Sequence, residues 1–163
     1  QNWPEEINIT KKTIDVDLDL ETNFGPESIK NNIDSKPEFV WMTAESLGDN
    51  DPALNYYSNL PAVFIFDKPL LNYLQLSTKR IIFLLDCLRE LSNKRSTQVY
   101  LDDPIEYLKN KNFASTFAAV PKYKKITRVN IPTTEFPSVR LVKPINFYPS
   151  SYSSWKKRIE LNI

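Results

Sequence analysis

The chain has 163 residues and a mass of 19.0 kDa, and its hydrophobic fraction of 41% is enough for one domain with an ordinary core. It contains no histidine, one cysteine (Cys87) and two glycines (Gly25 and Gly48). These absences exclude a Ser-His-Asp triad, a Cys-His pair, a zinc site of His and Cys ligands, and the glycine-rich loops that cradle phosphates. Carboxylate, lysine or tyrosine chemistry, oxygen-ligand metal binding, and the binding of a ligand or partner remain, and we identify no catalytic residue and no metal ligand.

The net charge of +1 conceals two ends of opposite sign, since residues 1–38 hold nine Asp and Glu against four Lys, and residues 120–163 hold nine Lys and Arg against two Glu. The basic end either meets the acidic end, faces a polyanion, or is a solvated surface. No apolar run approaches the roughly 20 residues that span a bilayer, and the first residues lack the pattern of a signal peptide. With a single cysteine, these features lead us to expect a cytoplasmic protein without a membrane segment.

Residues 1–36 are predicted to form an acidic N-terminal extension, and residues 37–163 the α/β domain. Residues 14–20 alternate strictly between apolar side chains and aspartate, which is typical of a half-exposed edge strand and equally compatible with a disordered acidic arm.

Four elements are predicted in the first half of the domain. The apolar runs 39–42 and 61–67 predict strands that are covered on both faces, and Asp51 followed by Pro52 predicts a helix start between them. Residues 77–94 predict an amphipathic helix, because their leucines and isoleucine recur at helical spacing and Ser77 can cap it.

The second half continues the alternation. Residues 97–101 predict a strand, Asp103 and Pro104 begin a short helix over 105–110, and residues 117–120 predict a fourth strand. After Pro121 we find no long helical pattern, only short apolar stretches at 126–131 and 139–143. The pattern therefore predicts a doubly wound α/β fold, a mainly parallel five-stranded sheet with helices on both faces in the Rossmann-like manner.

Several motifs, in this order, resemble the N-terminal α/β domain of the DNA photolyase and cryptochrome family. The resemblance covers about residues 39–120 and the last dozen residues. It is carried by Val-Trp-Met at 40–42, Asp-Asn-Asp-Pro-Ala-Leu at 49–54, the strand at 61–67, the Arg-containing helix around 79–85, Val-Tyr-Leu-Asp-Asp-Pro at 99–104, and Tyr-Ser-Ser-Trp-Lys-Lys-Arg at 152–158.

The resemblance implies a non-catalytic domain that holds a light-harvesting folate or deazaflavin, while FAD and the DNA lesion site belong to a helical domain elsewhere. The chain departs from the family at residues 43–48, where two arginines are lost, and after residue 121, where a helix is absent or much shortened. We therefore expect either a fragment or subunit of a larger flavoprotein, or a stand-alone relative without photochemistry.

Ligands of doubly wound sheets bind beyond the carboxyl ends of the strands. This rule selects six candidate cofactor-binding residues: Thr43, Glu45, Asp67, Lys68, Lys122 and Tyr123. Trp41 is a seventh candidate because it could stack on a pterin or flavin ring, although an apolar strand residue is more typical of the core.

The expected function is that of a photolyase-related module which binds an antenna chromophore of folate or flavin type, or docks on a helical flavin domain or another partner protein. One alternative is a nucleotide-binding sensor or enzyme on the same fold. The other is a structural subunit whose basic end, with Lys156, Lys157 and Arg158 beside aromatic residues, contacts nucleic acid or protein.

Overall fold

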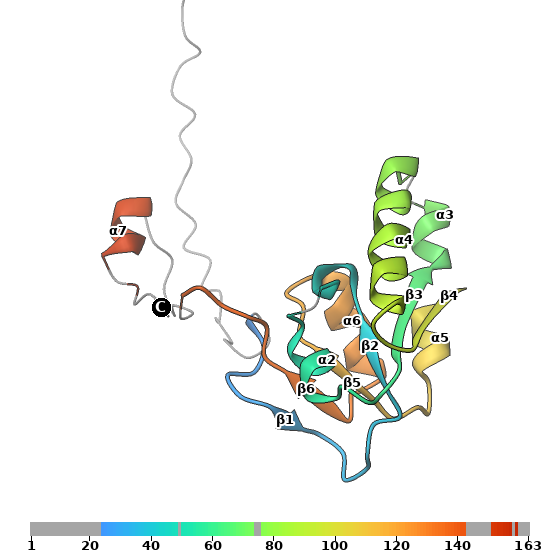
Figure 1. The fold of residues 1–163 in the computed structure, drawn as a ribbon. Coiled ribbons are helices and arrows are strands. Elements are labelled where there is room, and N and C mark those ends of the chain that lie inside the picture. The colour runs from blue at the N-terminus through green and yellow to red at the C-terminus, as the bar shows by residue number, and fades with distance from the viewer. Residues whose placement is uncertain (1–23, 49, 74–75, 143–150, 158, 160–163) are drawn as a thin grey trace, which may run out of the picture.

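The computed structural model describes residues 24–48, 50–73, 76–142, 151–157 and 159. At its centre is a six-stranded sheet in the order β1-β6-β5-β2-β3-β4 (Figure 1). Five strands are parallel, and β1 pairs antiparallel with β6 at one edge. The strands are β1 (Lys30–Asn31), β2 (Phe39–Met42), β3 (Ala62–Asp67), β4 (Thr97–Asp102), β5 (Phe113–Thr116) and β6 (Thr134–Phe136).

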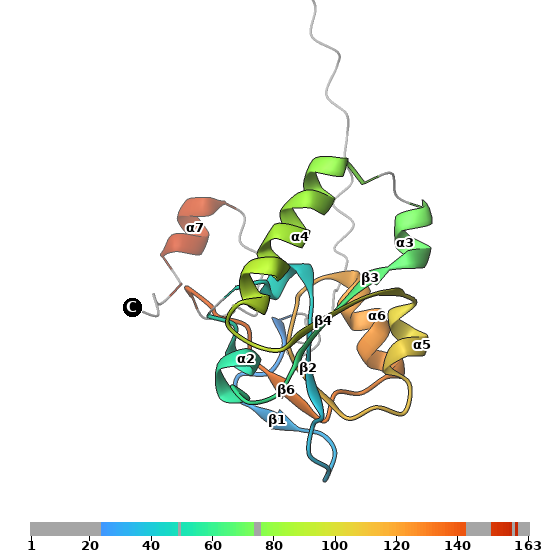
Figure 2. The same ribbon diagram turned by 45° about the vertical axis from the view of Figure 1, so that its right-hand side comes forward.

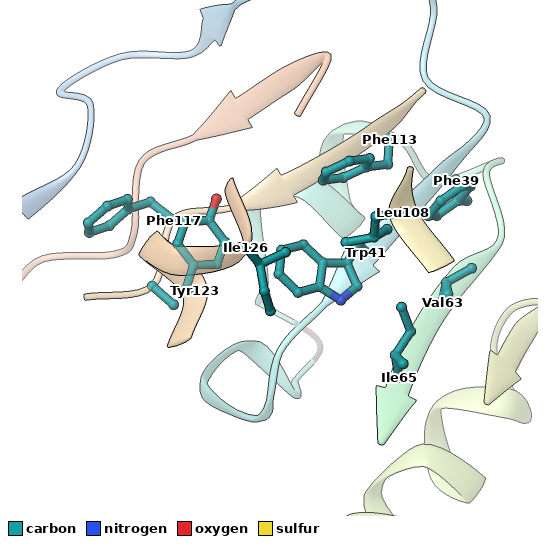
Figure 3. Packing of buried hydrophobic residues seen from close by; sticks show 10 residues of the cluster. Phe39, Trp41, Val63, Ile65, Leu108, Phe113, Phe117, Tyr123 and Ile126 are labelled. Atoms are coloured by element: carbon teal, nitrogen blue, oxygen red, sulfur yellow. The ribbon is translucent and has the colours of Figure 1, made fainter. Parts of the chain in front are cut away.

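Helices pack on both faces of this sheet. One face carries α2 (Pro52–Tyr56) and α4 (Thr78–Ser92), and the other carries α5 (Pro104–Leu108) and α6 (Pro121–Val129). Because side chains alternate along a strand, Trp41 and Val63 join the core under α5 and α6, while Val40 and Phe64 join the core under α2 and α4. The first of these cores is drawn in Figure 3. The expected mainly parallel α/β sheet with helices is confirmed, with a short sixth strand added.

Three helices, α2, α4 and α5, begin where local sequence signals place them. The Asp51 carboxylate accepts a hydrogen bond from the Leu54 N–H at 2.8 Å and caps α2, and Asp103 accepts one from the Ile105 N–H at 2.8 Å and caps α5. Ser77 stands at the N-cap position of α4 in extended conformation. Each of these starts was predicted from the sequence.

The second half of the chain differs from the prediction in two elements. The fourth parallel strand spans Phe113–Thr116 rather than residues 117–120, because it is the segment at 113–116 that pairs with β2 and β6. The helix that we expected to be absent or much shortened after this strand is present as α6, with nine residues, and it includes much of the stretch at 126–131. Tyr123 and Ile126, three residues apart, are its buried side chains, so burial fixes a helix that the surrounding lysines conceal.

Residues 24–36, which we assigned to the N-terminal extension, are part of the folded structure. They supply β1, and the Arg140 guanidinium donates hydrogen bonds to the carbonyl oxygens of Phe24, Gly25 and Pro26. The alternating stretch at 14–20 falls among residues that are not described. Helices α3 (Lys68–Tyr73) and α7 (Tyr152–Lys156) complete the fold, and in both ribbon views α7 stands away from the sheet (Figures 1 and 2).

None of the described helices is both long enough and apolar enough to cross a lipid bilayer.

Candidate functional site

The candidate site is a cavity of about 390 Å³ at the carboxyl ends of β2 and β3. Helix α3 and the first turns of α4 and α6 enclose it. This volume falls in the range of small-molecule sites. The walls are mostly apolar and come from Met42, Phe64, Ile65, Phe66, Leu70, Leu71, Leu76, Leu84 and Val120, and polar or charged groups are contributed by Thr43, Glu45, Asp67, Arg80, Lys122 and Tyr123.

An ion pair between Asp67 and Lys122 bridges two sides of this cavity. Asp67 is the last residue of β3, and one of its carboxylate oxygens accepts the Leu70 N–H at 2.8 Å at the start of α3. The other oxygen lies 3.1 Å from the Lys122 ammonium, in the first turn of α6. Lys122 keeps 39% of its side chain exposed, so its ammonium is accessible to a ligand as well as to Asp67.

Thr43 and Glu45 lie on the loop that follows β2. Thr43 stands at the N-cap of a short 3-10 helix, η1 (Ala44–Ser46), and its N–H donates to the Ser46 hydroxyl at 3.2 Å. Glu45 is exposed and lines both the main cavity and a neighbouring hollow. The loop therefore forms the wall between the two.

Tyr123 and Trp41 occupy the core beside the cavity. Their rings stack at a centroid distance of 5.5 Å and an interplanar angle of 3°. Both side chains are labelled in Figure 3. The Tyr123 hydroxyl donates to the Glu135 carboxylate at 2.8 Å, and burial together with the charge of Glu135 holds the pKa of Tyr123 well above 10. Trp41 is buried, stacks on Tyr123 and does not line the cavity, so it is a core residue in this structure.

The structure thus brings together five of the seven candidate residues, and leaves Trp41 in the core and Lys68 exposed outside the lining. Sequence reasoning missed Leu70 and Leu71, because no helix was predicted between the strand at 61–67 and the helix at 77–94. It missed Arg80 and Leu84 because nothing local shows that the start of the predicted helix lines a cavity. The signal for α3 was present: Asp67 can cap, and proline at an early helical position is typical of a helix N-terminus.

A second hollow of about 260 Å³ lies between the carboxyl ends of β2 and β5. The strand order reverses there, since the chain runs outward from β2 to β4 and then returns to the other side of β2 with β5. Asp51 and Thr116 line this hollow, and Asp51 is buried, with burial raising the pKa of its carboxyl above the usual value. Its Oδ2 atom has no hydrogen-bond partner among the described groups.

The described residues contain no group of three or more His, Cys, Asp or Glu that is arranged to hold a metal ion. Lys156 is exposed at the end of α7 and Lys157 follows it, near the paired rings of Tyr152 and Trp155, whereas Arg158 is not among the described residues. What the main cavity offers chemically is an apolar chamber with two cations, Lys122 and Arg80, and two carboxylates at its rim.

No family of known proteins, no curated protein and no solved structure matches this chain.

Proposed function

We propose that this domain binds a small organic molecule that combines a flat apolar body with an anionic group. The observation that carries the proposal is the main cavity, in which apolar side chains of β2, β3, α3 and α4 surround a space of about 390 Å³. The anionic group would meet the Lys122 ammonium at the first turn of α6 and the Arg80 guanidinium at the first turn of α4. A helix N-terminus also favours negative charge, so the position of these two cations in first turns adds to the attraction of an anionic group.

The order of the parallel strands supports a doubly wound, Rossmann-like interpretation of the fold. Counted along the chain, β2, β3 and β4 extend in one direction, and β5 and β6 extend from β2 in the other. Folds with this reversal bind ligands beyond the carboxyl ends of their strands. The main cavity lies at the carboxyl ends of β2 and β3, and α6, the helix that follows β5 on the other side of the reversal, adds Lys122 and Tyr123 to its lining.

Within that proposal, a folate or flavin antenna pigment is the ligand class suggested by the resemblance to photolyases and cryptochromes. A folate has a planar pterin ring and a glutamate tail that is anionic, and a flavin has a planar ring system and an anionic tail when it is a phosphate ester. The domain would then serve as a pigment-binding module that docks on a helical flavin domain or a partner protein. A nucleotide as ligand is less favoured, because the loop after β2 has one glycine, Gly48, and makes no phosphate cradle.

Titration of the purified protein with a reduced folate and with a flavin, followed by absorption and fluorescence, tests the proposal. We expect saturable one-to-one binding. We expect Lys122→Ala to weaken it about 10- to 150-fold, the effect of losing one charge-assisted hydrogen bond. The matched control is Lys125→Ala, since Lys125 is exposed on the same helix and does not line the cavity. Absence of binding by both compounds would rule out the pigment, and equal loss in the two variants would show that the ligand is held elsewhere.

A further inference from the structure

The two edges of the sheet are protected to different degrees. One edge is closed by β1, which is two residues long and carries a charged residue, Lys30. The other edge is β4, which has six residues, all but the first exposed, and which pairs with β3 and with no other strand of the described residues. Short and charged edges resist pairing with another chain, whereas long, uncharged ones invite it.

The exposed side chains of β4 are apolar where a protected edge would be charged. Val99 is 44% exposed, Tyr100 37% and Leu101 63%, and the only charged residue of the strand is Asp102 at its end. In the view of Figure 2, β4 lies at the near side of the sheet. Single exposed apolar residues are ordinary on protein surfaces, but three in succession on an edge that no other described strand covers favour an interaction surface.

The apolar surface continues from β4 onto helix α4. Cys87 lines a small hollow beside the loop that follows β2. Because β2 is a central strand, the side of α4 that carries Cys87 faces the middle of the sheet. Leu85, two residues earlier, points to nearly the opposite flank because a helical residue turns by about 100°. Leu85 is 46% exposed and therefore extends the apolar surface on the β4 side.

The register with β3 decides which backbone groups of β4 face outward, where no other described strand pairs with them. The Ala62 N–H donates to the Ser96 carbonyl at 2.8 Å, which sets the parallel ladder between β3 and β4. Since alternate residues of a strand direct their N–H and C=O to opposite sides, Gln98 and Tyr100 face β3, and Val99 and Leu101 direct theirs away from the sheet.

We propose that two copies of this chain pair through β4 in antiparallel fashion about a two-fold axis at Tyr100, joining their sheets into one. In this register Val99 lies opposite Leu101 of the second copy as a hydrogen-bonded pair, and both side chains are on the α4 face. Tyr100 lies opposite Tyr100 of the second copy. Gln98 lies opposite Asp102 of the second copy, so an amide faces a carboxylate and no like charges face each other.

No other register suits the strand as well. Opposite residues of an antiparallel pair share a face, which requires the two-fold axis to pass through a residue rather than between two. An axis at Val99 would set Leu101 against the hydroxyl of Thr97 and leave Asp102 without the Gln98 amide. Self-complementarity of this kind is what a two-fold interface demands, and a second copy is therefore the partner that β4 fits best.

Size-exclusion chromatography with light scattering across a concentration series tests the association. We expect a species of twice the 19.0 kDa chain mass. Val99→Lys should shift it to the monomer, because lysine on an edge strand opposes pairing. Val129→Lys on α6, at a residue that is also exposed, is the matched control and should leave the dimer intact.

Disulfide cross-linking tests the register, in a chain whose own cysteine is replaced by Cys87→Ser. Tyr100→Cys should cross-link rapidly on mild oxidation, since a non-hydrogen-bonded antiparallel pair sets the two Cα atoms about 4.5 Å apart, within disulfide range. Gln98→Cys should not, because its two copies are offset by four residues, about 13 Å along the strands. A chain that stays monomeric at every concentration, or cross-links as readily through position 98 as through position 100, would overturn the proposal.

Discussion

Gly25 is the residue at which the N-terminal segment crosses the end of β5. Its φ of +77° is a conformation that L residues rarely adopt, and a Cβ there would overlap the ring of Phe117. We expect Gly25→Ala to lower the free energy of unfolding by about 2 to 3 kcal/mol, from backbone strain and overpacking together. Urea denaturation measures this.

The matched control for Gly25 is Gly48, whose Cβ would meet nothing within 4 Å. Gly48→Ala should change the free energy of unfolding by less than about 0.5 kcal/mol. Equal effects at the two glycines would contradict the packing of residues 24–26 against Phe117.

Asp51 combines a capping role with an unfavourable burial of charge. Burial raises the pKa of its carboxyl above 3.8, although the Leu54 N–H hydrogen bond opposes this. A raised folded-state pKa means that its contribution to stability is present below about pH 3.8 and is lost as the pH rises through the folded value. Asp51→Asn keeps the cap and removes the titration, so its stability relative to the unmodified protein should increase from acid to neutral pH.

Urea denaturation at acid and neutral pH compares the two proteins. Asp51→Ala serves as the contrast, since it loses the cap and should cost about 1 kcal/mol. A difference between Asp51→Asn and the unmodified protein that is the same at every pH would show that the carboxyl does not titrate differently on folding.

At the scale of elements, Arg95 holds the C-terminal end of α2 and the turn that follows it. Its guanidinium donates to the carbonyl oxygens of Leu54, Tyr57, Ser58 and Leu60 at 2.6–3.3 Å, which joins the turn after α2 to the start of β4. We expect Arg95→Ala to lower the free energy of unfolding by about 1 to 3 kcal/mol. Arg89→Ala, which removes an exposed pair with Asp86, should cost less than about 0.5 kcal/mol, as thermal unfolding of both variants will show.

Elements with strong local signals were predicted well. The helix at Thr78–Ser92, the Asp-Pro helix starts and the strands β2 and β3 depend on spacing and capping within a few residues. Strand β5 was misplaced because its residues Ser115 and Thr116 are polar, and the strand forms there only through pairing with β2 and β6. Sheet position is a non-local property that a single segment does not carry.

For the whole molecule, the buried Tyr123 leads us to expect that stability falls at alkaline pH. Its pKa is raised well above 10 by burial and by Glu135, so the stability it contributes is present below about pH 10 and is lost as the pH rises further. We expect the melting temperature to fall between about pH 10 and pH 11, and Tyr123→Phe to flatten that fall while losing about 1 kcal/mol at neutral pH.

Tyr73→Phe, at a tyrosine that is 85% exposed, should leave the alkaline profile unchanged. Melting curves recorded by circular dichroism supply the comparison. If Tyr123→Phe keeps the full alkaline fall, other groups cause it.

The sequence by itself determined the α/β class, the amphipathic helix and the exclusion of histidine and glycine-loop chemistries, because these follow from composition and short-range periodicity. It also selected Asp67 and Lys122, which follow from the rule that ligands bind at the ends of parallel strands. Only the tertiary structure decided that these two residues pair at 3.1 Å across a cavity, that Arg80 joins them, and that Trp41 does not. Those outcomes depend on which strands become neighbours and which edge stays open, and such contacts join residues far apart in the chain.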